Sequence, residues 1–353
     1  MSDADLSISF WDKVNVIRGI FTILIVAGYS SITALFRGSD GAITWGREVL
    51  HRVARYQTGV LSLKQRRWLR PTTGVALEKY CQKQSIPLET VQLAYGAKIH
   101  WVGDRSAKKA ILYFHGGGYI SSLVKGHAVF MRQCVEKLAG YGENTVLAFV
   151  EYGLAPEIKY PTQYIQGTES LRYLIREGYK PSDIILGGDS AGGNLALAVI
   201  SHILHPHPNI DRISLSEPLA GLLLLSPWVT FIVTAPSCRT NSNKDYLIPN
   251  NISGVANLFI DEIDYNEYSV PLSADSGWWR NLPAKQTLLV YGDHEVFRDD
   301  IREFSENMKE VENLTVVNCQ REVHVACIFD AEFGLESMDM AKTVFAWLGK
   351  IFS

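Results

Sequence analysis

Short apolar runs alternate with amphipathic stretches over most of the chain. Several runs are continuously apolar, for example ILYF at 111–114 and LLLL at 222–225. Such runs are typical of strands that are covered on both faces in a parallel sheet. We therefore predict strands at 90–95, 98–102, 110–114, 145–151, 183–187, 220–226, 286–291 and 313–318.

Stretches with helical spacing lie between these runs. In the second of them, five apolar residues fall on one face of a helix: Tyr164, Ile165, Leu171, Leu174 and Ile175. We predict helices at 124–140, 162–177, 191–204, 299–311 and 336–351. Alternating strands and helices indicate a doubly wound α/β sheet. The segment 227–285, rich in Asn, Ser, Pro and aromatic residues, predicts an excursion that leaves the sheet and returns to it.

The first 85 residues follow a different pattern. Gly19–Phe36 holds eighteen residues without a charge, and a bilayer requires about 20 apolar residues to be crossed. This run predicts a membrane anchor, a helix of a cap over the site, or a helix docked on the core. Thr44–Arg70, with seven basic residues, predicts one or two amphipathic helices. We therefore divide the chain into an N-terminal helical region, 1–85, and a sheet domain, 86–353.

Composition narrows the class of protein. The 353 residues include 34 Lys and Arg against 37 Asp and Glu, for a net charge of −3. This balance argues against a nucleic-acid partner, which would require a basic surface. The chain is 47% hydrophobic, enough for a large core. Its five scattered cysteines predict neither a disulfide framework nor a zinc site.

The strongest chemical signal is a G-x-S-x-G pattern around Ser190. It follows the apolar run that ends at Leu186 and opens the predicted helix 191–204. A sharp strand-to-helix turn needs small neighbours around its serine, and it exposes the hydroxyl at the helix N-terminus. Ser190 is therefore the predicted nucleophile.

A second signal, His115-Gly-Gly-Gly-Tyr119, follows the predicted strand 110–114. Successive glycines let the backbone approach a ligand and turn its N–H groups inward, as an oxyanion requires. The predicted donors are Gly116, Gly117 and Ala191, the last being the residue after the nucleophile. A phosphate-binding loop is the rival interpretation, but G-K-[ST] is absent.

A nucleophilic serine needs a base and an acid, in the chain order Ser, acid, His. Of nine histidines, only His324 lies beyond every segment that could supply the acid, so it is the predicted base. Asp293 and Glu295 both follow the predicted strand 286–291, and triad chemistry alone leaves the choice between them open. The histidines at 202, 205 and 207 are interrupted by prolines and predict a helix end, not a metal site.

Together these motifs resemble the hormone-sensitive-lipase-like α/β-hydrolases, which include arylacetamide deacetylases and fungal steryl acetyl hydrolases. The resemblance covers about 85–353 and extends to Tyr152-Gly-Leu-Ala-Pro-Glu157, where the family has Arg in place of Gly153. It implies the α/β-hydrolase fold: a mostly parallel eight-stranded sheet flanked by helices, with a helical cap from the N-terminal region and the 227–285 excursion. Aligning Val296-Phe-Arg-Asp-Asp300 with the family's acid turn favours Glu295 over Asp293.

The predicted function is a serine carboxylesterase that removes an acetyl or short acyl group from a small apolar ester. It would use Ser190, His324 and Glu295, with no metal and no organic cofactor. Two alternatives remain. One is a non-hydrolytic enzyme of the same fold, such as a lactonase, dehydratase or cyclase of secondary metabolism. The other is a small-molecule receptor, which the intact set of catalytic residues disfavours.

Two placements in the cell follow from different features. If Gly19–Phe36 spans a membrane, the arginines that follow it favour a cytoplasmic catalytic domain. The resemblance to luminal deacetylases instead favours the endoplasmic reticulum membrane. The sequence does not predict an oligomeric state.

Overall fold

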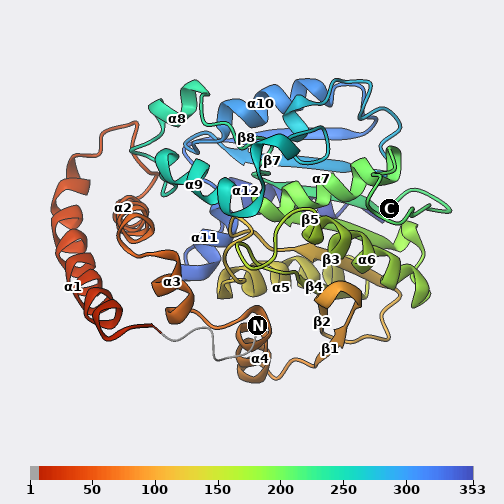
Figure 1. Cartoon of the computed structure of the whole chain (residues 1–353), viewed down its shortest axis with the longest axis horizontal. Coiled ribbons are helices and arrows are strands. Elements are labelled where there is room, and N and C mark those ends of the chain that lie inside the picture. Colours follow the sequence, from red (N-terminus) through yellow and green to blue (C-terminus); the bar gives the residue numbers. More distant parts are fainter. Residues whose placement is uncertain (1–7, 353) are drawn as a thin grey trace.

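One twisted sheet of eight strands forms the centre of the computed structural model, which describes residues 8–352 (Figure 1). The spatial order is β1-β2-β4-β3-β5-β6-β7-β8. β2 is antiparallel to β1 and β4, and every other pairing is parallel. The strands are β1 (Leu88–Gln92), β2 (Lys98–Val102), β3 (Lys109–Phe114), β4 (Thr145–Glu151), β5 (Ile184–Asp189), β6 (Gly221–Leu225), β7 (Thr287–Gly292) and β8 (Leu314–Cys319). The predicted fold class is confirmed.

Helices cover both faces of this sheet because its strands are apolar on both faces. In β3, Leu112 and Phe114 contact one core and Ile111 and Tyr113 the other. The first core includes side chains of α6 (Thr162–Arg176), α7 (Ala191–Leu204) and α10 (Arg298–Asn307). The second includes side chains of α4 (Thr73–Gln84), α5 (Lys125–Gly140), α11 (Ala326–Phe333) and α12 (Asp339–Leu348).

Three predictions of local structure differ from the fold. β1 ends at Gln92, not at residue 95, because the chain turns at 94–96 to pair with β2. α10 ends at Asn307, whereas the pattern extended it to 311. The 227–285 excursion contains two helices that the pattern did not predict, α8 (Pro236–Thr240) and α9 (Pro249–Phe259), and α11 was also missed.

The first three α-helices of the N-terminal region form a separate layer at one side of the molecule, whereas its fourth, α4, packs on the second core (Figure 1). Its first helix, α1 (Phe10–Thr33), begins nine residues before the uncharged run. Ser9 caps it: Ser9 Oγ accepts from the Asp12 N–H at 3.1 Å, and the Asp12 carboxylate accepts from the Ser9 N–H at 3.2 Å. The basic stretch forms two helices, α2 (Trp45–Val60) and α3 (Leu63–Leu69). The division at residue 85 stays a prediction, and residues 1–7 and 353 lie outside the described part.

A buried ion pair joins this layer to the sheet domain. Arg47 of α2 donates from Nε and Nη2 to the two carboxylate oxygens of Asp330 in α11, at 3.2 and 2.9 Å. Nη2 also donates to the carbonyl of Glu336 at 2.5 Å. Both side chains are nearly fully buried. Removing the guanidinium therefore leaves a buried carboxylate without its counter-charge.

We expect Arg47→Met to lower the free energy of unfolding by about 3–5 kcal/mol in urea titrations. Arg132→Met is the matched control, because it removes an exposed i,i+4 pair with Glu136 and should change that free energy by less than about 1 kcal/mol. Equal, small losses in the two variants would show that the Arg47–Asp330 pair does not hold the layer in place.

Candidate active site

Ser190 occupies a strained turn between β5 and α7. Its φ of 52° and ψ of −118° lie outside the regions that a non-glycine residue favours. The turn is tight: a Cβ on Gly188 would lie 2.2 Å from the Gly192 carbonyl oxygen, and a Cβ on Gly192 would lie 1.9 Å from that of Phe114. The Ser190 N–H donates to the Leu225 carbonyl at 2.9 Å. The G-x-S-x-G pattern thus reflects a backbone that only glycine permits on both sides of the serine.

His324 and Glu295 form a buried pair at the same edge of the sheet. His324 Nδ1 lies 2.7 Å from Glu295 Oε2. The other carboxylate oxygen accepts from the Gly292 N–H at 2.6 Å and from Ser226 Oγ at 3.1 Å. Burial acts to lower the pKa of His324, but the hydrogen bond and charge of Glu295 outweigh it and raise that pKa above its ordinary value. A carboxylate on Nδ1 fixes the ring proton there and leaves Nε2 free to accept one.

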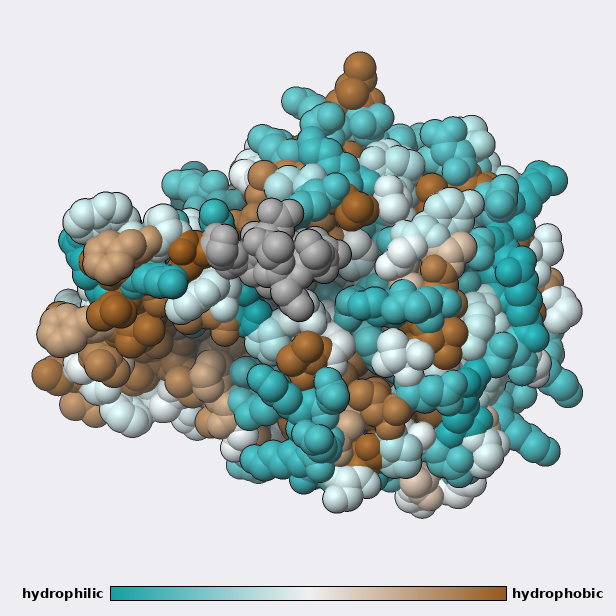
Figure 2. Space-filling model, turned by 60° about the horizontal axis from the view of Figure 1, so that its bottom comes forward, coloured by the Kyte–Doolittle hydropathy of each residue, from teal (hydrophilic) through white to brown (hydrophobic). Residues whose placement is uncertain are grey.

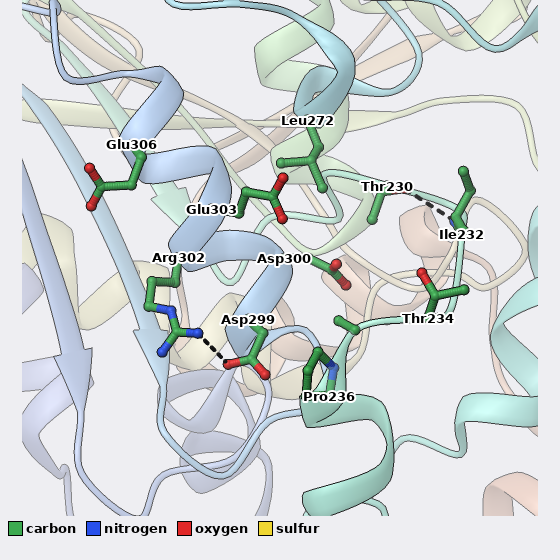
Figure 3. A pocket seen from close by; sticks show the side chains of 11 residues that line it. Thr230, Ile232, Thr234, Pro236, Leu272, Asp299, Asp300, Arg302, Glu303 and Glu306 are labelled. Carbon is green, nitrogen blue, oxygen red and sulfur yellow. Dashed lines mark hydrogen bonds and ion pairs between the residues drawn. The ribbon is translucent and has the colours of Figure 1, made fainter.

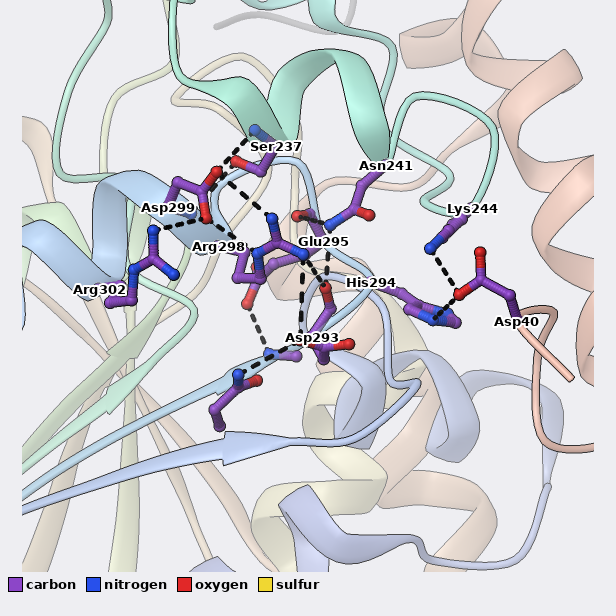
Figure 4. A network of polar contacts seen from close by, with 12 residues as sticks. Asp40, Ser237, Asn241, Lys244, Asp293, His294, Glu295, Arg298, Asp299 and Arg302 are labelled. Carbon is purple, nitrogen blue, oxygen red and sulfur yellow. Dashed lines mark hydrogen bonds and ion pairs between the residues drawn. The ribbon is translucent and has the colours of Figure 1, made fainter.

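Asp293, the alternative acid, is held elsewhere (Figure 4). Its carboxylate accepts from Asn318 Nδ2 at 3.4 Å and lies 4.0 Å from Arg298 Nη1. The structure therefore brings Glu295, and not Asp293, to His324. In the described part of the chain the hydroxyl of Ser190 makes no hydrogen bond, to His324 or to any other group. Such bonds are often long before substrate binds.

In the glycine loop, one of the three predicted oxyanion donors, Gly116, is wrong. The Gly116 N–H donates to Asp189 Oδ1 at 2.9 Å, so it is not available to an oxyanion. Gly117 and Gly118 take φ values of +114° and +63°, which glycine permits. Between residues 8 and 352, the N–H groups of Gly117, Gly118 and Ala191 have no hydrogen-bond partner. Gly118 thus replaces Gly116 in the candidate set.

The carboxylate of Asp189, a residue to which no sequence motif assigns a role, accounts for the loss of Gly116 as a donor. Its buried carboxylate accepts from the Tyr113 hydroxyl, the Gly116 N–H and His127 Nε2, at 2.9–3.2 Å. Burial acts to raise the pKa of Asp189, but His127 and these donors outweigh it, so the pKa is lowered. Asp189 therefore ties the glycine loop to the turn that carries Ser190.

A second buried acid, Asp245, lies in the 227–285 excursion and was also missed. Its carboxylate accepts from the Val296 N–H at 2.8 Å and from the His324 N–H at 3.4 Å. Burial, together with the charge of Glu295, raises the pKa of Asp245 to about 6. From the N-terminal region, Arg55 Nε donates to the Asp245 carbonyl at 2.6 Å. The backbone N–H groups of Val296 and His324 are thus held by one carboxylate, and α2 contacts the main chain of the residue that carries it.

Aromatic residues of the excursion buttress the glycine loop. Phe259 stacks on Tyr119, the residue after Gly118, with ring centroids 3.9 Å apart. Phe231 contacts both Phe259 and Trp228, and all four rings are buried. These side chains therefore pack the interior and hold the loop in place.

A cavity of about 600 Å³ lies beside α10 (Figure 3). It is lined by Thr230, Ile232, Thr234, Ala235, Pro236, Leu272, Asp299, Asp300, Arg302, Glu303 and Glu306. None of the candidate catalytic residues belongs to it. Burial and the neighbouring Glu303 raise the pKa of Asp300 there to about 7. The candidate site is therefore defined by the geometry at the strand ends and not by this cavity.

The remaining titratable candidates have structural partners. His202 Nε2 lies 3.0 Å from the Asp211 carbonyl, and His202 Nδ1 accepts from the His207 N–H at 2.9 Å. All five cysteines are buried free thiols. Within residues 8–352, no three His, Cys, Asp or Glu side chains are arranged to hold a metal ion.

Comparisons with known proteins point to one family. A family profile described as the alpha/beta hydrolase fold matches residues 111–328. An esterase of Acinetobacter venetianus is 29% identical over 247 residues, which cover 69% of this chain and 76% of that one. An arylacetamide deacetylase of Oryctolagus cuniculus is 30% identical over 109 residues, 29% of this chain and 26% of that one.

The fold is also shared with solved structures. A hormone-sensitive lipase from a metagenome library superposes with a TM-score of 0.67 at 22% identity, over 89% of this chain and 100% of that one. An esterase of the bacterial hormone-sensitive lipase family superposes with a TM-score of 0.63 at 21% identity, over 93% and 98% of the two chains.

Proposed function

Because the chain belongs to the α/β-hydrolase fold family, we propose that it is a serine carboxylesterase that hydrolyses a small apolar ester. The family match, the relatives and the solved structures together confirm the predicted resemblance to hormone-sensitive-lipase-like enzymes. One observation carries the proposal: the 2.7 Å His324–Glu295 pair lies at the same sheet edge as a serine in a strained strand-to-helix turn. Relatives named esterase and deacetylase support the same chemistry.

The reaction proceeds through an acyl-enzyme. His324 Nε2 takes the proton of Ser190 as the serine oxygen attacks the ester carbonyl. The N–H groups of Gly117, Gly118 and Ala191 hold the negative charge that develops on the carbonyl oxygen. His324 then gives its proton to the departing alcohol. Water attacks the acyl group by the same route and restores the free serine.

Glu295 acts on the reaction through His324. Its carboxylate keeps the ring proton on Nδ1 and stabilises the imidazolium that forms when Ser190 loses its proton. Because Glu295 Oε1 is held by Gly292 and Ser226, the carboxylate has little freedom to turn away. The turn thus presents the base in one orientation.

The test is turnover of p-nitrophenyl esters of increasing acyl length, followed as a function of pH. Activity requires neutral His324, so kcat/KM should rise with pH through the pKa of His324, which Glu295 raises above its ordinary value. A preference for acetyl and other short chains would agree with the proposal. An enzyme that turns over none of these esters at any pH would contradict it.

A further inference from the structure

The first helix leaves a broad apolar surface uncovered. Eleven large apolar side chains in the segment 10–36 are largely exposed, and several recur on one helical face (Figure 2, left). They are Phe10, Trp11, Ile17, Ile20, Phe21, Leu24, Ile25, Tyr29, Ile32, Leu35 and Phe36. Monomeric soluble proteins rarely expose an apolar surface of this extent, so it requires a partner.

This helix is also long enough to interact with a bilayer. The most apolar 18-residue window within Phe10–Phe36 has a mean hydropathy of 1.9, and only 17% of that window is buried. Trp45 lies beside it and donates from its ring N–H to the Ser31 carbonyl at 2.8 Å. An amphipathic ring of this kind is typical of the interface between lipid and water.

Contacts along its length tie α1 to α2 and α3. Near its start, Gln65 Nε2 donates to the Asp12 carbonyl at 3.3 Å. Midway, Gly19 faces Leu61, whose Cδ2 a glycine Cβ would approach to 3.0 Å. At its end, Arg52 Nη1 donates to Thr33 Oγ1 at 2.8 Å. One face of α1 is therefore held against polar helices while the opposite face is open.

This attachment argues against a helix that crosses the membrane. If α1 spanned the hydrocarbon, α2 would enter it as well, together with the Arg52–Glu48 ion pair. Charged groups at that depth are costly, and α2 carries four of them: Arg47, Glu48, Arg52 and Arg55. An orientation parallel to the membrane plane places only the open face of α1 in lipid and keeps α2 in water.

The excess of basic residues in the N-terminal region favours anionic lipids as the partner of α1. Residues 1–85 contain 12 Lys and Arg against 6 Asp and Glu, whereas 86–353 contain 22 against 31. Lys13, Arg18 and Lys64 are exposed on or beside α1. This positive region would repel a second copy of itself and would attract anionic headgroups.

We propose that α1 lies in the plane of an anionic lipid membrane, with its open apolar face among the acyl chains and its basic neighbours at the headgroups. The inference is independent of the proposed catalysis. It adds a fourth arrangement to the three predicted from Gly19–Phe36, which are a membrane anchor, a helix of a cap and a helix docked on the core. The layer next to α1 also contacts the site, since Arg55 of α2 donates to the carbonyl of Asp245.

The experiment is flotation of the full-length protein with vesicles of phosphatidylcholine alone or mixed with phosphatidylserine. We expect binding to both, stronger to the mixed vesicles, and weakened by salt only in the mixed case. The variant Phe21→Asp with Leu24→Asp should lower the vesicle-bound fraction about tenfold or more, because it removes two apolar side chains from lipid. Alkaline carbonate should release the wild type from the vesicles. A protein with a spanning helix would stay in the membrane under the same treatment.

Ile263→Asp is the matched control, because Ile263 is 92% exposed but lies far along the chain in the excursion. It should float like the wild type. Both variants should keep the thermal midpoint and any hydrolysis of water-soluble esters. The proposal is overturned if the wild type does not float, if both variants float equally, or if carbonate leaves the protein in the membrane. It is also overturned if light scattering shows a detergent-free dimer that the α1 variant dissociates.

Discussion

Replacing Ser190 with alanine should lower kcat for p-nitrophenyl esters by about 10⁶-fold, to the level that binding and oxyanion contacts alone sustain. The loss should be this large because the serine oxygen forms the covalent bond, and no neighbouring group replaces it. The variant should fold, since alanine removes a hydroxyl that makes no hydrogen bond within the described residues. Initial rates and a thermal melt, measured side by side, check both parts.

Ser201→Ala is the control for that experiment. Ser201 lies buried on α7, the helix that begins directly after Ser190, and its hydroxyl accepts from Trp278 Nε1 at 3.1 Å. Its loss should affect stability more than rate, with kcat within about threefold of the wild type. A Ser190→Ala enzyme that retains a tenth or more of wild-type kcat would remove Ser190 from the mechanism.

Glu295→Gln should lower kcat by about 10⁴-fold, the loss expected when the acid no longer fixes the histidine tautomer. The pH dependence of the activity that remains in this variant should also change. Glu295 raises the pKa of His324, so its removal lowers that pKa and moves the acid limb of the pH profile to lower pH. A variant that merely loosened the fold would not move this limb.

Asp293→Asn provides the comparison, because this carboxylate contacts Asn318 and Arg298 and not His324. Its kcat should stay within about threefold of the wild type. If Asp293→Asn suffers the larger loss and Glu295→Gln the smaller, the acid has been assigned to the wrong residue.

The sheet could be predicted from sequence because its strands carry the signal locally. Strands β3, β5, β6 and β7 contain continuous apolar runs. Such runs are typical of parallel strands that are buried on both faces of a sheet. Ser190 was also predictable, since its turn excludes side chains at positions that the pattern itself displays. Helix ends were less predictable. α1 begins at Phe10 because of a Ser9–Asp12 capping box, which the uncharged run does not reveal.

The details of the site depend on contacts between segments far apart in the chain. Asp189, 73 residues beyond Gly116, determines which N–H groups of the three successive glycines are free to bind an oxyanion, because its carboxylate accepts from the Gly116 N–H. The hydrogen bond from the His324 N–H to the Asp245 carboxylate depends on how the 227–285 excursion folds back onto the sheet. No periodic pattern in the sequence predicts that fold. An acidic residue directly before the serine was the one available signal for Asp189. A buried strand tolerates a carboxylate there only when donors surround it.

The central claim is that Ser190 is a nucleophile activated by His324, and covalent labelling tests it most directly. The full-length protein should take up one fluorophosphonate per chain, and peptide mass spectrometry should locate the adduct on Ser190. Labelling should disappear in Ser190→Ala and slow strongly in Glu295→Gln. An adduct on another residue, or ester turnover by a protein that the probe does not label, would contradict the account.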